Sequence, residues 1–370
     1  MWPDRRLMDL IGTELPIIQA PMAGANGSAL AMAVSEAGGL GSLPCAMLDV
    51  VKTRAEIGVI RQRTSKPFNV NFFCHTPPAP DPARDAAWVA RLRPYYVELG
   101  LDPDAPVAAP SRAPFDAAMC AIVEETRPAV VSFHFGLPAP DLLARVKGAG
   151  CVVLSSGTTV AEARWLEDNG CDAIIAQGVE AGGHRGFFLT HDITAQPGTF
   201  ALVPQVEDAV KVPVIAAGGI GDGRGIAAAF ALGAAGVQMG TAYLFTPEAL
   251  TTDLHRARLR QARDDNTVLT NVISGGPARG FMTRFVRETG PMSDAAPAFP
   301  TAGAPLAPLK AKAEAAGSSD FSTQWAGQAA ALSGKIGGRA VGAAELTRTL
   351  AQDALKRLKA LGAAREQGRA

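Results

Sequence analysis

The sequence has few cysteines, few aromatic residues and no excess of charge of either sign. Its five cysteines are an odd number and contain no C-x-x-C pair, which argues against a disulfide framework and against a structural zinc site. The 35 basic and 35 acidic residues cancel, so the chain lacks the basic surplus that a nucleic-acid or anionic-membrane partner would require. Aromatic residues make up only 6%, which favours a core of small aliphatic side chains over an all-β sandwich.

Long hydrophobic runs are also missing. The longest apolar stretch, residues 226–239, is interrupted by Gly233 and Gly236 and is too short to span a bilayer. The first twelve residues contain two arginines but no apolar run, so no signal peptide is expected. We therefore expect a cytoplasmic protein with neither a membrane nor a nucleic acid as partner. A chain of 370 residues with 48% hydrophobic residues is long enough to bury a sizeable core.

Short apolar runs alternate with helical patterns along most of the chain. These runs are mostly uninterrupted, as in strands that are buried on both faces, and each is followed by a helical stretch. Eight such units predict an α/β protein with a (β/α)8 TIM barrel, and a doubly wound open sheet is the alternative. The predicted strands are residues 16–20, 40–42, 68–73, 129–132, 151–155, 173–177, 213–216 and 236–239.

Residues 247–338 break this alternation. The segment contains a polar helical stretch followed by an Ala- and Pro-rich length, and it is too long for a plain loop inside a compact domain. A linker is one interpretation. We instead predict a cap or substrate domain at 247–338, inserted before the last helix, with the barrel formed by residues 1–246 and 339–370.

Two glycine-rich turns follow the last two predicted strands. The first contains Gly218 and Gly219, and the second is the Gln-Met-Gly-Thr run at 238–241. Glycine lets the backbone approach a ligand closely, and in barrels the loops after strands seven and eight commonly bind a phosphate. Because no acidic residue follows the first turn at about twenty positions, a conventional nicotinamide-binding domain is disfavoured. The turns therefore predict a phosphate site.

A third signal, AQGVEAGGHRG at 176–186, begins at the end of the sixth predicted strand. Gln177 can both donate and accept hydrogen bonds, so its amide could pair with the imide edge of a flavin. Gly182 and Gly183 would let a flat ring lie against the backbone. His184 is then a candidate acid, base or cation, and the alternative is that it only caps a loop.

Two further polar residues are expected on the same rim of the barrel. Asn71 interrupts the apolar strand FNVNFF, and His134 ends the fourth strand within SFHFGLP. A buried amide at Asn71 needs partners, while His134 is a candidate substrate ligand or a hydrogen-bonded structural histidine. No H-x-x-x-H or clustered His/Asp pattern occurs, so no metal is expected. His191 and His255 have no supporting context.

Taken together, these segments resemble the nitronate monooxygenase family of FMN-dependent TIM barrels, and SFHFGLP looks like its class I members. The resemblance also includes the segment near the N-terminus, PIIQAPMAGANGSALAMAVSEAGGLGSL, and covers residues 16 to about 250 closely. It implies that His184 is the catalytic histidine and that Ala20, Pro21 and Met22 lie along the isoalloxazine. The remaining implied FMN ligands are Asn71, Gln177, Gly182, Gly219, Gln238, Met239, Gly240 and Thr241.

The resemblance further implies a reaction. An alkyl nitronate, with propionate 3-nitronate as the natural substrate, would be oxidised by FMN and O2 to a carbonyl product and nitrite, in a detoxifying role. The expected partners are thus a small anionic substrate and dioxygen. Two alternatives stay open: an NADH-dependent flavin reductase on the same barrel, acting on a quinone or an enoyl thioester, and a non-catalytic protein that binds a phosphate-bearing ligand.

Overall fold

An eight-stranded parallel barrel forms the centre of the computed structural model, which describes residues 1–107, 112–337 and 341–367. The strands pair in the order β1-β9-β8-β6-β5-β4-β3-β2, and a parallel bridge between Ile18 and Leu40 joins the two ends of this order. The fold is the predicted TIM barrel, not the open sheet. Its strands are β1 Ile17–Gln19, β2 Gly41–Pro44, β3 Phe68–Phe73, β4 Val130–His134, β5 Val152–Gly157, β6 Ala173–Gln177, β8 Val214–Ala217 and β9 Gly236–Met239.

Helices connect successive barrel strands, because parallel strands need a crossover between them. Several begin at a capping side chain; for example, Thr159 accepts a hydrogen bond from the backbone N–H of Glu162 at 3.2 Å. No helix in the described part of the chain combines the length and apolarity that a membrane crossing requires. The helices outside the predicted cap are α1 Arg6–Ile11, α2 Ser28–Glu36, α3 Val50–Arg63, α4 Pro82–Glu98, α5 Ala117–Thr126, α6 Pro140–Gly148, α7 Val160–Asp168, α8 Thr199–Glu207, α9 Gly223–Ala231 and α14 Ala343–Gln367.

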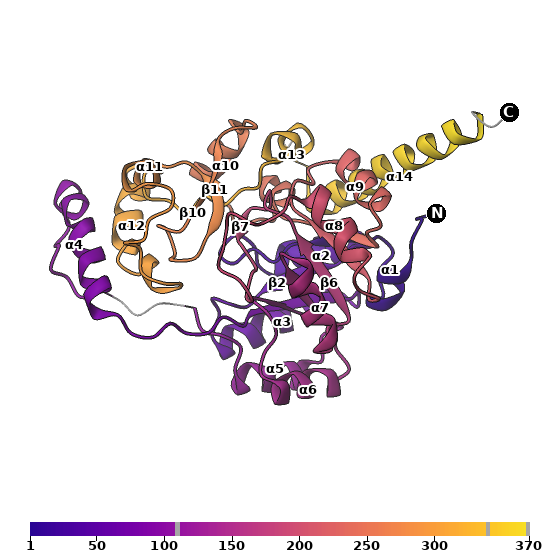
Figure 1. The fold of residues 1–370 in the computed structure, drawn as a ribbon, viewed down its shortest axis with the longest axis horizontal. Coiled ribbons are helices and arrows are strands. Elements are labelled where there is room, and N and C mark those ends of the chain that lie inside the picture. Colours follow the sequence, from indigo (N-terminus) through magenta and orange to yellow (C-terminus); the bar gives the residue numbers. More distant parts are fainter. Residues whose placement is uncertain (108–111, 338–340, 368–370) are drawn as a thin grey trace.

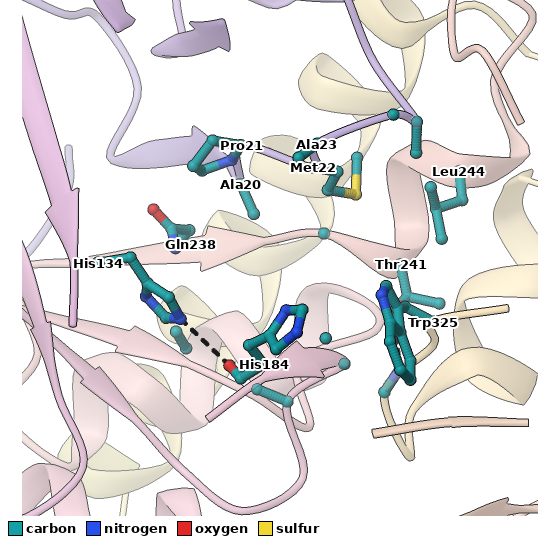
Figure 2. Close-up of a pocket in the computed structure, with 18 of the residues that line it drawn as sticks. Ala20, Pro21, Met22, Ala23, His134, His184, Gln238, Thr241, Leu244 and Trp325 are labelled. Atoms are coloured by element: carbon teal, nitrogen blue, oxygen red, sulfur yellow. Dashed lines mark hydrogen bonds between the residues drawn. The ribbon is translucent and has the colours of Figure 1, made fainter. Parts of the chain in front are cut away.

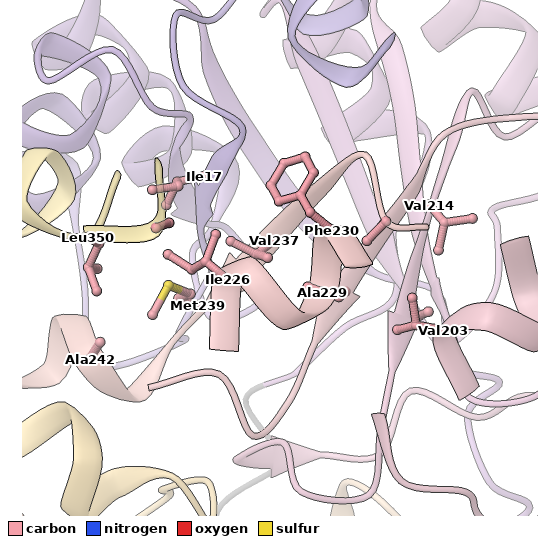
Figure 3. Close-up of a cluster of buried hydrophobic side chains, with 14 of the residues drawn as sticks. Ile17, Val203, Val214, Ile226, Ala229, Phe230, Val237, Met239, Ala242 and Leu350 are labelled. Carbon is pink, nitrogen blue, oxygen red and sulfur yellow. The ribbon is translucent and has the colours of Figure 1, made fainter. Parts of the chain in front are cut away.

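The largest hydrophobic cluster lies between the barrel strands and their outer helices (Figure 3). It joins Val214 and Val237 on the strands to Ile226 and Phe230 on α9. Leu350 of α14 is fully buried in the same cluster, so the last helix covers a barrel whose first strand is more than three hundred residues away. Burial of this apolar surface is the main favourable contribution to the stability of the barrel.

A polar layer fills the barrel interior just below its C-terminal mouth. The Asn69 amide donates to the hydroxyls of Ser42 at 3.0 Å and Ser132 at 2.8 Å, and the Asn71 amide donates to the Ser132 hydroxyl at 2.9 Å. Buried amides need such partners. The layer therefore fixes Asn71 at the level where ligands bind in barrel enzymes.

The chain after β9 builds a smaller unit on the barrel mouth. Its antiparallel sheet has the order β10-β11-β7, with β7 contributed by the loop after β6. The division at 246/247 and 338/339 stays a prediction, and residues 338–340 lie outside the described residues. The elements of this unit are β7 Gly183–His184, η1 Thr241–Phe245, α10 Asp253–Arg260, β10 Thr267–Thr270, β11 Ala278–Phe281, α11 Arg284–Thr289, η2 Thr301–Gly303, α12 Ala307–Ala315 and α13 Ala330–Gly337.

Helix α4 packs against this unit although it belongs to the segment predicted as barrel. Figure 1 shows it beside α11 and α12, away from the other crossover helices. Trp88 and Leu92 share a buried cluster with Phe285 and Leu309, and the Trp88 indole donates to the Ala302 carbonyl at 3.1 Å. The cap is therefore built from two separate parts of the chain.

Candidate active site

A cavity of about 320 Å³ lies at the C-terminal mouth of the barrel, under the cap. Its volume is within the range of small-molecule sites. Figure 2 shows His184 between His134 and Trp325, across from the turn that carries Ala20, Pro21 and Met22. The structure brings every site residue proposed from the sequence to this one cavity: Ala20, Pro21, Met22, Asn71, His134, Gln177, Gly182, Gly183, His184, Gly218, Gly219, Gln238, Met239, Gly240 and Thr241.

The backbone of His184 is held by the cap sheet. His184 pairs with Ala278 and Gly183 with Arg279, so the short strand β7 adds to the edge of β11. The next residue continues this attachment, because the Arg185 N–H donates to the Pro277 carbonyl at 2.9 Å. A segment about ninety residues later in the chain thus positions the histidine.

The Ser274 hydroxyl is the hydrogen-bond partner of the His184 ring. The ring Nε2 lies 2.8 Å from the Ser274 hydroxyl, and the same hydroxyl lies within hydrogen-bond distance of the Gly276 carbonyl, at 3.3 Å. When Ser274 donates to Gly276, it accepts from Nε2, and the imidazole proton then lies on Nε2. Nδ1 is left with its lone pair and makes no hydrogen bond to another described residue. This tautomer has a basic nitrogen available.

The surroundings of His184 favour the neutral ring. Burial, followed by the charge of Arg112, holds the pKa of His184 well below its usual value. Aromatic rings enclose the imidazole, with centroids 5.0 Å away at Phe299 and 5.6 Å away at Trp325. A neutral imidazole is the form that accepts a proton, so the site favours a base over a cation before the substrate binds.

Both ring nitrogens of His134 form hydrogen bonds within the protein. Its Nε2 donates to the His184 carbonyl at 3.3 Å, and its Nδ1 lies 2.6 Å from the Ser156 hydroxyl, which must be the donor. Burial lowers the pKa of His134 to about 4. The ring lines the cavity, yet these bonds favour a role in supporting the His184 loop. Its role as a substrate ligand stays a prediction.

Gln177 also holds this loop. Its amide nitrogen donates to the His184 carbonyl at 3.0 Å, and its amide oxygen accepts from the Gly186 N–H at 2.7 Å. The Gln177 amide was proposed to pair with the imide edge of a flavin, but both its nitrogen and its oxygen form hydrogen bonds to the protein. Arg185, 1% exposed, reinforces the loop through the Gly178 and Ala181 carbonyls at 2.9 and 3.1 Å.

The opposite side of the cavity fits a phosphate-bearing flavin. Gly218 and Gly219 have φ of 108° and 69°, a conformation that favours glycine. Their backbone N–H groups, and that of Gly240, donate to no other residue within 1–107, 112–337 and 341–367. The Gln238 amide oxygen is buried and has no partner among the same residues. Unused donors with one unpaired acceptor are what a bound phosphate and polar cofactor chain would satisfy.

Sequence reasoning missed several side chains that line the cavity. Arg112 lies in the Pro-rich segment between α4 and α5. Phe299, Lys310 and Trp325 lie near the cavity, on or beside the cap. His255, which no motif marked, is 8% exposed, and its Nε2 has no partner in the described part of the chain. Only tertiary packing brings Arg112, Phe299, Lys310 and His255 to the site, so no local sequence signal could have identified them. Trp325 differs, because it begins WAGQAAAL, a segment that also resembles the family.

The buried histidines predict an acid-sensitive fold. Burial lowers the pKa of His255 to about 4, as it does for His134, whereas unfolded histidines titrate near pH 6.5. Between these values the unfolded chain binds more protons, so stability should fall as the pH falls. We expect the Tm to drop by several degrees between pH 6.5 and 5. His255→Gln, which cannot titrate, should show a smaller drop, whereas an equal drop in both proteins would contradict this origin.

Comparison with known proteins places these features in one family. A sequence model described as nitronate monooxygenase matches residues 4–353. The nitronate monooxygenase of Pseudomonas aeruginosa is 45% identical over 94% of this chain and 98% of its own length. That of Paraburkholderia phytofirmans is 42% identical over 94% of each chain. Among solved structures, nitroalkane oxidase from Streptomyces ansochromogenes has a TM-score of 0.86 and 37% identity over 96% of this chain and 99% of its own. FabK from Thermotoga maritima has a TM-score of 0.74 and 29% identity over 98% and 99%.

Proposed function

Because this chain belongs to the nitronate monooxygenase family and is a flavin-dependent oxidoreductase, we propose that it oxidises alkyl nitronates with FMN and O2 to a carbonyl product and nitrite. The observation that carries this proposal is the cavity itself, which joins two glycine turns with unused amides to a half-buried, neutral histidine. We propose propionate 3-nitronate as the natural substrate, which gives the enzyme a detoxifying role.

The residues of the barrel mouth would hold FMN. The backbone N–H groups of Gly218, Gly219 and Gly240 are suited to the phosphate of FMN. The Gln238 amide oxygen could accept a hydrogen bond from the hydroxyl-bearing chain of FMN. The turn at 20–22 would lie along the ring, opposite His184. Bound there, FMN supplies the electron transfer from substrate to oxygen, while the protein orients the reactants and excludes water.

His184 moves a proton in this proposal. When the substrate is a neutral nitroalkane, Nδ1 takes the proton from the α-carbon, and the ring becomes a cation beside the new nitronate anion. Ser274 keeps the ring oriented through Nε2, and the His184 carbonyl is held by Gln177 and His134. A preformed nitronate needs no proton transfer, so only binding and orientation act on it. The aromatic rings around His184 keep bulk water from this step.

An anaerobic titration tests the proposed function. The purified protein should be yellow, and an alkyl nitronate should bleach its flavin absorbance without oxygen, whereas NADH should not. The likeness to FabK favours the NADH-dependent flavin reductase as the second candidate. Bleaching by NADH alone would select that reductase and reject the monooxygenase. A colourless protein that binds no FMN would reject both enzymes in favour of a ligand-binding protein.

A further inference from the structure

Arg112 places a guanidinium at the mouth of the cavity. Three residues later, the Phe115 N–H donates to the Phe73 carbonyl at 2.7 Å, and the Phe115 ring packs 5.2 Å from that of Phe133. These contacts attach the segment to the C-terminal ends of β3 and β4. The Arg112 guanidinium lies over the Phe299 ring, 5.8 Å from its centroid, and lines the same cavity as His184. The side chain is therefore held by the barrel on one side and covered by the cap on the other.

No carboxylate balances this charge in the described part of the chain. Desolvation alone lowers the pKa of Arg112, with no acidic group beside it, and its buried Nε has no hydrogen-bond partner among the described residues. Glu314 is the sole acidic side chain among the described cavity-lining residues, and it accepts a hydrogen bond from Ser322 at 2.6 Å. The groups that sense the Arg112 charge are His75 and His184, and neither is an anion. An unpaired, half-buried cation is costly unless a ligand brings the opposite charge.

The other cations near the cavity are placed differently. Arg185 donates its hydrogen bonds to backbone carbonyls of the loop that carries His184. Lys310 stands on α12 near Glu314, and its charge acts on the pKa of His255, whereas the charge of Arg112 acts on that of His184. Arg112 is thus the free guanidinium on the side of the cavity where the nitro group would react.

We infer that Arg112 is a substrate-specificity residue that binds a carboxylate carried by the nitronate, an inference that rests on the proposed function. Its planar fork matches the two oxygens of a carboxylate, which a lysine ammonium does not. The unpaired Nε, the stacking on Phe299 and the lack of an acidic partner are then explained together. The enzyme should accordingly prefer short nitronates with a terminal carboxylate over simple alkyl nitronates.

Two substrates of equal carbon number test this inference. Propionate 3-nitronate carries a carboxylate where propyl-1-nitronate has a methyl group, so the ratio of their kcat/KM values isolates the contribution of that carboxylate. In Arg112→Met this ratio should fall by about 10–100-fold, as expected for loss of a charge-assisted hydrogen bond, and mainly through KM. Arg112→Lys should give an intermediate ratio, and the matched variant Lys310→Met should keep the wild-type ratio. Flavin content and Tm verify that each variant folds.

Each outcome decides the inference. An unchanged ratio in flavin-loaded Arg112→Met, or in Arg112→Lys if the Met variant does not fold, would overturn it. A selective loss in Lys310→Met alone would transfer the role to α12 and likewise overturn it. If the wild-type protein oxidises neither nitronate, the proposed function fails and the inference fails with it. Oxidation of both nitronates with no preference in any protein would leave the proposed function standing and reject only the role of Arg112.

Discussion

Replacing His184 by asparagine should lower kcat/KM for a neutral nitroalkane by roughly 10²–10⁴-fold, the usual contribution of a general base. The loss should be much smaller for the corresponding nitronate. Proton removal from carbon needs the lone pair on Nδ1, and asparagine has no basic nitrogen. The nitronate has already lost this proton, so it forfeits only orientation and charge attraction. Steady-state kinetics with both forms of one substrate, normalised to flavin content, separate the two roles.

Ser274→Ala is the matched control for this prediction. It removes the hydroxyl 2.8 Å from Nε2 but leaves the base in place, so its effect should be smaller than that of His184→Asn. Equal losses for nitroalkane and nitronate in His184→Asn would mean that the histidine mainly binds the anion. Unchanged activity with both would make His184 a structural residue and His134 the next candidate.

Gly219→Val should weaken FMN binding by about 10–100-fold, as expected for the loss of a charge-assisted hydrogen bond to a phosphate. Gly219 has a φ of 69°, which a β-branched residue rarely adopts, so the turn would have to change shape. A Cβ there would also lie 3.4 Å from the Glu180 Cβ, which leaves the new methyl groups little space other than the cavity. The ratio of flavin to protein after purification measures the effect.

Gly100→Val separates the loss of flavin from general backbone strain. Gly100 has a φ of 67°, almost that of Gly219, but a Cβ there meets no atom within 4 Å. It follows α4, outside the residues that line the cavity. This variant should keep its flavin even if its Tm decreases. Full flavin content in Gly219→Val would remove the phosphate assignment, whereas equal flavin loss in both variants would attribute the effect to strain.

The barrel and the residues around its mouth were largely predictable. Uninterrupted apolar runs mark strands buried on both faces, and every predicted run corresponds to a barrel strand. Because residues at the C-terminal ends of parallel strands meet at one rim, strand assignment alone gathers Asn71, His134 and Gln177. Thr159 and Glu162 have the spacing of a capping box, but the box is only half formed. Thr159 caps α7, but the Glu162 carboxylate accepts from Thr158 and from the N–H groups of Phe188 and Leu189.

The partners of these residues were not predictable, because they depend on long-range pairing. A two-residue strand such as β7 has no periodicity, and nothing in AGGHRG indicates that it pairs with β11. Gln177 was assigned to a flavin because an amide has both a donor and an acceptor, and the loop uses both. Arg112 lies in a Pro-rich stretch that reads as a connection, and its place over Phe299 exists only once the cap has docked.

The pairing of β7 with β11 has a consequence for the order in which the protein assembles. Most contacts within the barrel join strands that follow one another in sequence, and only the closing pair, in which Ile17 of β1 lies beside Val237 of β9, joins its two ends. The β7–β11 pair closes a loop that contains α8, β8, α9, β9 and much of the cap. Closing such a loop carries an entropic cost before any of its contacts form, so low-contact-order regions form first. The sequential strand pairs from β2 to β9 can thus form before His184 has a fixed position. Chemical competence is therefore acquired late by the folding chain, and it arises only when distant parts of the polypeptide meet.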